Sequence, residues 1–558
     1  MRWRLDLLVL VAASLGLAPI STARSEPRDE AARVDQLFRQ WDKPNSPGCA
    51  VAVMKDGRIV HKRGYGMADL DRGDKITPAT VFHVGSISKQ FTAAAVLMLE
   101  HEGKLSLDDA VRTYVPELPD FGVKITLRHL LHHTSGLRDQ WELLRLAGWG
   151  PQDLITDEHV LTIMSRQRTL NFPPGSEFLY SNTGFTLLAQ IVKRVSGRTF
   201  RNFTTERVFL PLVMEHTHFR DDHAETVKNI AYGYRQNGNR FDLNVPNFDT
   251  VGATSLLTTV EDLALWDENF YTARVGGEAI IKELQAPGRL DDGTAIDYAA
   301  GLVVTKYRGL KIVDHAGEDA GYKAHMMRFP DQHFSVATLC NLASINPNAL
   351  SRKIADIYLA AELAPAEAAD GDFPTSPQPG PDRLAALAGV YVDLDDGIRI
   401  LRLQVEDGKL WGGAFNGKGY ELRAIGDARF RYVVFQTELS FRQDETGTPT
   451  GFTARTKEGR SFQFSRATAY QPTVAQLEDF TGVFRSDEID PPYEVIIKDG
   501  HLVVRSKAAD LPLLPVTADL FVSGLNRIRF TRNAEGHVSG ALLSTPRIRN
   551  FRFERLAR

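Results

Sequence analysis

The order of apolar and polar positions divides the chain into a mixed α and β region followed by a region of short strands. Between residues 86 and 101 the apolar side chains recur at helical spacing, and Gly103 ends the pattern. Further helices are expected at 28–41, over much of 101–213, and at 347–362, with strands at 47–54, 58–67, 298–304, 310–313 and 333–340. Strands on both sides of a helical block predict an α+β domain whose sheet is assembled from distant segments.

Residues 363–382 contain five prolines, a composition typical of a linker. The sequence after it alternates in short strands and contains an internal repeat, in which 387–391 recurs as 480–484 and 407–410 as 499–502. We therefore predict two small antiparallel β-barrels of similar size, which resemble lipocalins in scale. The expected organisation is a signal peptide at 1–23, a hydrolase-like domain at 27–362, the linker at 363–382, and barrel units at 383–469 and 473–558.

The N-terminus predicts export. Two arginines precede an apolar run from Leu7 to Leu17, and Ser21-Thr22-Ala23 provides small residues for cleavage near Ala23. The apolar run is too short to span a membrane. We expect a periplasmic or secreted protein with no integral membrane segment once the signal is removed. The 66 Lys and Arg nearly balance the 70 Asp and Glu among 558 residues, so the charge does not indicate a nucleic-acid partner.

The chain has two cysteines, Cys49 and Cys340, each within a strand-like segment. This number excludes a disulfide-rich scaffold and a cysteine-rich metal site. Two buried free thiols are the favoured prediction, and a disulfide between them is the alternative.

Ser86 and Lys89 form the one S-x-x-K of the chain. Residues three apart lie on one face of a helix, so the Lys89 amine is expected beside the Ser86 hydroxyl, where it can accept or relay the proton that a serine nucleophile must lose. About two chance matches are expected in a chain of this length. The simpler interpretation is that Ser86 caps a helix and Lys89 is a solvated charge, so the pair requires support from other motifs.

That support comes in sequence order. His132-His133-Thr134-Ser135-Gly136 is followed by Tyr180-Ser181-Asn182, by Gly252-Ala253-Thr254-Ser255, and by His315-Ala316-Gly317. With these S-x-x-K, Y-x-N and H-x-G elements, residues 30–362 resemble the penicillin-recognising serine hydrolases, which include class C β-lactamases, D-Ala-D-Ala carboxypeptidases and D-aminopeptidases. The two C-terminal barrels resemble the architecture of the D-aminopeptidases, in which a barrel loop shapes the cleft; here, they are equally compatible with spacers. Pro512-Leu513-Leu514-Pro515 is the segment that we would examine first as such a loop.

The resemblance implies a role for each motif residue. Ser86 is the expected acylated nucleophile, and Lys89 and Tyr180 are expected to share its proton, with a nearby ammonium lowering the pKa of the phenol. Asn182 suits a position between Lys89 and a substrate amide. The N–H groups of Ser86 and Glu318, next to Gly317, are expected to bind the oxyanion.

His315 and Glu318 bear on the substrate. The resemblance implies lysine at position 315 in class C β-lactamases, whereas histidine carries only a conditional charge near neutral pH. We further hypothesise that Glu318 repels a carboxylate and favours a substrate with a free amine.

We therefore predict an exported serine hydrolase that cleaves amide bonds of small or D-residue-containing peptides through an acyl-serine. An esterase, or a weak β-lactamase or D-Ala-D-Ala carboxypeptidase with the same site, is the alternative. A less favoured alternative is a protein without enzymatic activity that binds an apolar ligand in its barrels. We expect a small-molecule or peptide substrate and neither cofactor nor metal, and the sequence allows a homo-oligomer.

Overall fold

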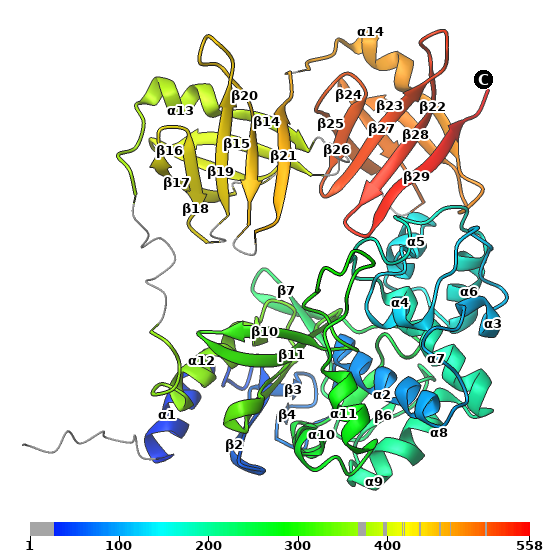
Figure 1. The fold of residues 1–558 in the computed structure, drawn as a ribbon, viewed down its shortest axis with the longest axis vertical. Coiled ribbons are helices and arrows are strands. Elements are labelled where there is room, and N and C mark those ends of the chain that lie inside the picture. Colours follow the sequence, from blue (N-terminus) through cyan, green and yellow to red (C-terminus); the bar gives the residue numbers. More distant parts are fainter. Residues whose placement is uncertain are drawn as a thin grey trace, which may run out of the picture.

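The structure is a computed structural model that describes residues 27–557 except 366–374, 394–398, 416, 418, 435–436, 457–458, 469 and 508–509. The expected signal peptide lies outside the described residues, as does much of the expected linker. Within them the chain forms an α+β body from α1 to α12 and then two closed β-barrels (Figure 1). We call the α+β body the catalytic body. No helix among the described residues has the length and apolar character needed to span a bilayer.

A six-stranded antiparallel sheet forms one layer of the catalytic body, in the order β10-β11-β12-β13-β1-β2. Its strands are β1 (Cys49–Lys55), β2 (Arg58–Tyr65), β10 (Val303–Tyr307), β11 (Leu310–Asp319), β12 (Tyr322–Phe329) and β13 (Phe334–Cys340). β1 pairs with β13, with Val51 opposite Thr338, so distant parts of the chain share one sheet as the sequence predicts. Smaller sheets contain β3 (Met67–Asp69) with β4 (Asp74–Lys75), β5 (Phe82–His83) with β9 (Leu256–Thr258) and β6 (His218–Phe219), and β7 (Tyr234–Asn237) with β8 (Arg240–Leu243).

Strand β12 is absent from the elements predicted from the sequence. This strand lies between two others and is buried along nearly its whole length, so its side chains do not alternate between core and solvent. Its polar residues are paired inside the protein: His325 lies 3.1 Å from Asp314, and Arg328 donates to Asp267 at 2.7 Å. Because these paired polar residues interrupt the apolar run, a prediction based on hydrophobicity does not find this buried strand.

The helices form the remainder of the catalytic body, with α2 at its centre. They are α1 (Pro27–Phe38), η1 (Gly85–Ile87), α2 (Ser88–His101), α3 (Val111–Tyr114), α4 (Leu127–Leu131), α5 (Gln140–Leu146), α6 (Asp157–Ser165), α7 (Asn182–Ser196), α8 (Phe200–Thr204), η2 (Thr205–Phe209), α9 (Leu210–Leu212), α10 (Val260–Thr272), α11 (Gly277–Leu284), η3 (Pro330–Gln332) and α12 (Pro347–Tyr358). Every residue of α2 from Ser88 to Leu99 is buried. Ser86 lies in η1, the single turn before α2, and not within α2 itself.

Each barrel has eight antiparallel strands joined in chain order. The first, preceded by α13 (Pro381–Leu387), contains β14 (Gly389–Asp393), β15 (Ile400–Glu406), β16 (Lys409–Ala414), β17 (Tyr420–Gly426), β18 (Arg429–Tyr432), β19 (Glu438–Gln443), β20 (Pro449–Arg455) and β21 (Ser461–Arg466). The second, preceded by α14 (Val474–Leu477) and η4 (Glu478–Phe480), contains β22 (Gly482–Arg485), β23 (Tyr493–Lys498), β24 (His501–Arg505), β25 (Asp510–Pro515), β26 (Leu520–Ser523), β27 (Asn526–Arg532), β28 (Val538–Thr545) and β29 (Ile548–Arg555). The first repeated segment thus leads into the first strand of each barrel, and the second covers the turn between the second and third strands of each.

Two interpretations that the sequence left open for the barrels are not supported in the second barrel. The segment Pro512–Pro515 belongs to strand β25, and Leu513 packs inside the second barrel, so this segment is not a loop that enters a cleft. The interior of the second barrel is filled by side chains such as Phe484, Phe530 and Phe553, which leave a cavity of about 20 Å³. Since that is little more than the space of one water molecule, this barrel does not hold an apolar ligand.

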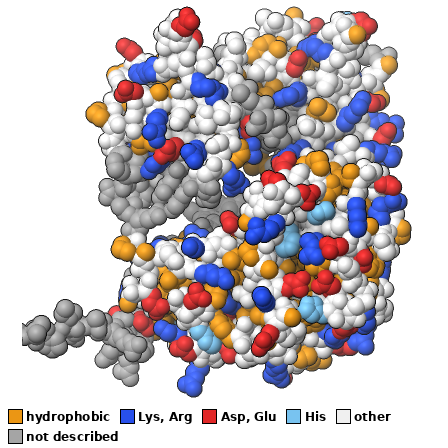
Figure 2. All heavy atoms as spheres, viewed as in Figure 1, with side chains coloured by type: hydrophobic (Ala, Val, Ile, Leu, Met, Phe, Trp, Pro, Cys, Tyr) orange, Lys and Arg blue, Asp and Glu red, His pale blue; other side chains and the backbone are white. Residues whose placement is uncertain are grey.

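The second barrel packs against the helical side of the catalytic body, directly above α5 in Figure 1. Arg138 and Glu488 form a buried ion pair across this interface at 2.5 Å, and the Tyr493 hydroxyl donates to the Leu146 carbonyl at 2.8 Å. Figure 2 shows acidic and basic side chains interspersed on the visible face of the molecule, as the balanced composition leads one to expect.

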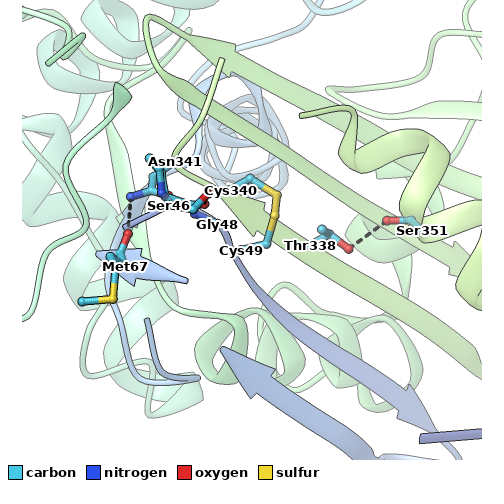
Figure 3. Close-up of a disulfide and its surroundings, with 9 residues drawn as sticks. Ser46, Gly48, Cys49, Met67, Thr338, Cys340, Asn341 and Ser351 are labelled. Carbon is cyan, nitrogen blue, oxygen red and sulfur yellow. Dashed lines mark hydrogen bonds between the residues drawn. A yellow bond between two sulfur atoms is a disulfide. The ribbon is translucent and has the colours of Figure 1, made fainter. Parts of the chain in front are cut away.

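Cys49 and Cys340 face each other on β1 and β13 and form a disulfide (Figure 3). The prediction of two free thiols is therefore wrong: the register of two strands that are distant in sequence places the cysteines opposite each other. Beside the disulfide, the Asn341 side chain accepts from Gly48 N at 2.8 Å and donates to the Met67 carbonyl at 3.0 Å. These bonds tie the end of β13 to the residue before β1 and to the start of β3.

Candidate active site

A cleft of about 880 Å³ contains the predicted site residues. Its lining includes, from the sequence prediction, Ser86, Tyr180, Asn182, His315, Gly317 and Glu318. Lys89 is fully buried beneath this surface, so the interpretation of a solvated lysine is wrong. The cleft also contains residues that the sequence analysis did not assign, among them Tyr298, Asp319, Lys323 and Arg547.

The Lys89 amine has three polar neighbours. Its Nζ lies 2.9 Å from Ser86 Oγ, 2.9 Å from Asn182 Oδ1 and 2.7 Å from the Ala253 carbonyl oxygen. Two of these neighbours only accept hydrogen bonds, whereas the serine hydroxyl can also donate. A neutral amine has two N–H groups and one lone pair, so it can donate to the two carbonyl oxygens and accept from Ser86.

The electrostatics of Lys89 favour that neutral form. Burial, helped by Arg547, lowers the pKa of Lys89 to about 7, against the opposing effect of Asp319 and Asp139. Near neutral pH a large fraction of the amine is therefore deprotonated and able to take the Ser86 proton.

The expectation for Tyr180 is wrong. We expected a neighbouring ammonium to lower the pKa of the phenol, but burial raises it above its usual range, and the hydrogen bond with Ser86 and the charge of Arg547 offset the rise only in part. Tyr180 packs against the His133 ring with the ring centres 4.2 Å apart. A phenol that keeps its proton is suited to give it to a leaving group, and the neutral Lys89 amine is the better base.

Asn182 is held by Asp139, a residue that the sequence analysis missed. Asp139 Oδ2 accepts from both the backbone N and the side-chain Nδ2 of Asn182, each at 2.8 Å. Because the amide nitrogen is occupied in this way, the amide oxygen must face Lys89. Asp139 is fully buried and also caps α5 by accepting from Trp141 N. It therefore orients a site residue without lining the cleft.

We predict that Asp139→Asn lowers kcat by about 10- to 100-fold with a smaller change in KM, because Asn182 can then rotate its amide and donate to the Lys89 nitrogen. Steady-state kinetics on a hydrolysed amide checks this, with the circular dichroism spectrum as evidence that the fold persists. An unchanged kcat would show that Asp139 only caps α5.

The turn that carries Ser86 abuts strand β11 because two glycines allow it. A Cβ built on Gly317 would lie 1.9 Å from the Val84 carbonyl oxygen, and one on Gly85 would lie 2.7 Å from Glu318 N. Gly85 also has a φ of 52°, which side chains disfavour. The glycine of the H-x-G motif is thus required because the backbone around Ser86 and the backbone around Glu318 approach each other closely. The expected oxyanion site lies between these two segments.

His315 is neutral in this environment. Burial and the nearby Lys89 lower the pKa of His315 to about 4. Its Nδ1 lies 2.6 Å from the Ala316 carbonyl and its Nε2 lies 3.0 Å from the Tyr298 hydroxyl. Because a carbonyl only accepts, we assign the proton to Nδ1 and a hydrogen bond from Tyr298 to Nε2. Both ring nitrogens are therefore occupied within the protein.

Residues 34–361 match the Beta-lactamase family. The chain belongs to this family. Over 82% of its length it is 27% identical to a D-aminopeptidase from Gluconobacter oxydans (strain 621H), covering 83% of that protein, and over 88% it is 27% identical to a D-aminopeptidase from Brucella anthropi, covering 92%. Among solved structures, the octameric penicillin-binding protein homologue from Pyrococcus abyssi has the same fold, with a TM-score of 0.53, 22% identity, and coverage of 86% of this chain and 97% of that one. The protein is thus a beta-lactamase-family serine hydrolase, close in sequence to D-aminopeptidases.

Within this beta-lactamase-family cleft, the hypothesis about Glu318 does not hold in its original form. The Glu318 side chain is 70% exposed and pairs with Lys323, which also lines the cleft. Since the two charges neutralise each other, Glu318 is not an uncompensated charge that repels a carboxylate.

Arg547 is the residue by which the second barrel enters the site. It lies in the turn between β28 and β29, and its Cζ is 5.0 Å from the centre of the Tyr180 ring. No motif of the catalytic body could predict it, because it is folded into place from the far end of the chain. In this member of the family, therefore, the second barrel forms part of the cleft and is more than a spacer.

Two groups of described residues have side-chain atoms close enough to share a metal ion, Glu100-His101-Glu283 and Asp222-His223-Asp249. Neither group lines the cleft, and we assign no metal to them.

Proposed function

We propose that the protein is an exported hydrolase that cleaves amide bonds of small peptides with a D residue on the acyl side, through an acyl-serine intermediate. The observation that carries the proposal is the Lys89 amine, buried between two acceptor oxygens and the Ser86 hydroxyl. The D-aminopeptidases that align over most of the chain support the choice of a D residue and of an amide.

In the proposed acylation, neutral Lys89 takes the Ser86 proton while Oγ attacks the amide carbonyl. The oxyanion that forms is stabilised by the N–H groups of Ser86 and Glu318. Tyr180 donates its proton to the leaving nitrogen as the bond to it breaks, and the proton now on Lys89 balances the phenolate charge. Water then attacks the acyl-serine as the Tyr180 phenolate takes a proton from it, and the Lys89 ammonium returns its proton to the leaving Ser86 Oγ.

A free amine on the substrate has a partner of its own in the cleft. The Asp319 side chain lines the cleft, and its Oδ2 lies 2.9 Å from His83 Nε2. Its negative charge is not matched by Lys323, which pairs with Glu318. Asp319 is therefore the carboxylate that we assign to the ammonium group of an aminopeptidase substrate.

Export is part of the proposal. The basic N-terminus followed by a short apolar run and small residues is the motivating pattern. The disulfide between Cys49 and Cys340 adds support, since such bonds persist in oxidising compartments such as the periplasm. Mass measurement of the N-terminus of the mature protein tests it, and an uncleaved Met1 in exported material would contradict the assigned cleavage near Ala23.

Parallel assays of the mature protein and Ser86→Ala test the activity. The substrates are D- and L-alanyl anilides, a D-Ala-D-Ala peptide, a chromogenic cephalosporin and a nitrophenyl ester. We expect the D-alanyl anilide to exceed its L counterpart in kcat/KM, and Ser86→Ala to lose about 10⁴-fold or more. A preference for the ester or the cephalosporin would favour the alternative of an esterase or β-lactamase, and full activity in Ser86→Ala would overturn the mechanism.

A further inference from the structure

Two side chains of the catalytic body hold the backbone of Arg547 at the edge of the cleft. Glu142 Oε2 accepts from Arg547 N at 3.1 Å and also from the Thr545 hydroxyl. On the other side, Asn171 Nδ2 donates to the Arg547 carbonyl at 3.0 Å. Both the backbone N–H and the backbone carbonyl of Arg547 are thus hydrogen-bonded to the catalytic body. The position of this arginine at the cleft is therefore fixed by the structure.

The guanidinium group has capacity left for a ligand. It carries five N–H donors in a planar fork that suits a carboxylate. Its one ion-pair partner among the described residues is Asp139, with Nη1 3.5 Å from an Oδ2 that already accepts two bonds from Asn182. The Arg547 side chain is 38% exposed and lines the cleft.

The other basic groups of the cleft are already engaged. Lys323 pairs with Glu318, and the Lys89 amine is surrounded by Ser86, Asn182 and Ala253. His315, at the position where class C relatives are expected to have lysine, is neutral with both nitrogens bonded. Arg547 therefore remains as the basic side chain of the cleft that a substrate anion can reach.

We propose that Arg547 binds the α-carboxylate of the leaving residue, so that the preferred substrates are D-residue dipeptides with a free C-terminus. This inference rests on the proposed function, because it assumes that Ser86 opens an amide bond and that Tyr180 protonates the leaving nitrogen.

The position of Arg547 supports binding of the carboxylate of the leaving residue over binding of a carboxylate on the acyl side. Its Cζ lies 5.0 Å from the centre of the Tyr180 ring, whose hydroxyl serves the leaving nitrogen in the proposed mechanism. One extended residue spans about 3.5 Å, so the carboxylate of the leaving residue falls within reach of the guanidinium. Planar guanidinium groups bind carboxylates through two parallel hydrogen bonds.

The test compares D-Ala-D-Ala with its C-terminal amide as substrates for the wild type, Arg547→Gln and Arg547→Lys. We expect Arg547→Gln to lower the kcat/KM ratio of free acid to amide by about 10- to 100-fold, chiefly through KM, and Arg547→Lys to restore part of it. Arg552→Gln removes an equivalent charge from the exposed face of β29, where Arg552 pairs with Glu554, and should leave the ratio unchanged.

A binding experiment separates affinity from turnover. In the Ser86→Ala background, calorimetry should show weaker binding of the free dipeptide, but not of its amide, when Arg547→Gln is added. Equal losses on acid and amide would overturn the inference, since they would mean that Arg547 acts only by lowering the pKa of Lys89. An effect confined to D-glutamyl amides, whose carboxylate is on the acyl side, would overturn it as well. If the wild type cleaves neither peptide, or Ser86→Ala cleaves both, the proposed function itself fails.

Discussion

Lys89→Met is expected to lower kcat/KM on a D-alanyl amide by about 10³-fold or more. The variant removes the group that takes the Ser86 proton while keeping an apolar chain of similar length in a fully buried position. Ser86 Oγ then loses the amine that lies 2.9 Å away, and burial of the Tyr180 phenol keeps the pKa of that group too high for it to act as a replacement base. Steady-state kinetics measures the loss.

The pH profile identifies the base. Because the neutral amine is the active form and the pKa of Lys89 is lowered to about 7, kcat/KM of the wild type should rise as pH increases through about 7 and then level off. Lys193→Met, at an exposed lysine of α7, is the matched control and should keep both the rate and the profile. Activity near the wild-type level in Lys89→Met, or a profile that is flat across pH 7, would contradict the assignment.

Glu488→Gln is expected to lower the free energy of unfolding by about 3–5 kcal/mol, because it leaves the buried Arg138 cation without its counter-charge. The pair joins the second barrel to the catalytic body, with Nη1 2.5 Å from Oε2. Arg138 also donates to Gln167 at 2.9 Å and to Thr169 at 2.7 Å, so these neutral partners remain but cannot balance the charge.

Asp490→Asn provides the control for that loss. Asp490 lies two residues further along the same connection, and its pair with Arg166 is exposed, so its removal should cost less than about 1 kcal/mol. Urea unfolding of the two variants measures the difference. Equal stability of Glu488→Gln and Asp490→Asn would show that the buried pair does not hold the barrel in place.

The site residues that the sequence predicted either are fixed by local geometry or belong to the motifs of the resembled family. Ser86 and Lys89 are three residues apart and one helical turn brings them together, while Gly317 is required by the close approach of β11 to the Ser86 turn. Asp139 and Arg547 were not predicted because their positions depend on tertiary packing. Asp139, which precedes α5, binds Asn182 at the start of α7, and Arg547 lies in the turn between two strands of the second barrel.

The protonation states also required the structure. A nearby ammonium was expected to lower the pKa of Tyr180, but burial raises it, and burial also lowers the pKa of Lys89. The sequence could name Lys89 and Tyr180 as the groups that exchange the Ser86 proton, but it could not tell which of them acts as the base. For the fold, the repeat was sufficient to predict two barrels, whereas the disulfide depended on the register of β1 against β13.

Mass spectrometry of the enzyme, quenched with acid during turnover of a D-alanyl anilide, shows whether Ser86 carries the acyl group. We expect one D-alanyl group on the proteolytic peptide that contains Ser86 and no such adduct in Ser86→Ala. An adduct on a different residue, or continued turnover by Ser86→Ala, would contradict it.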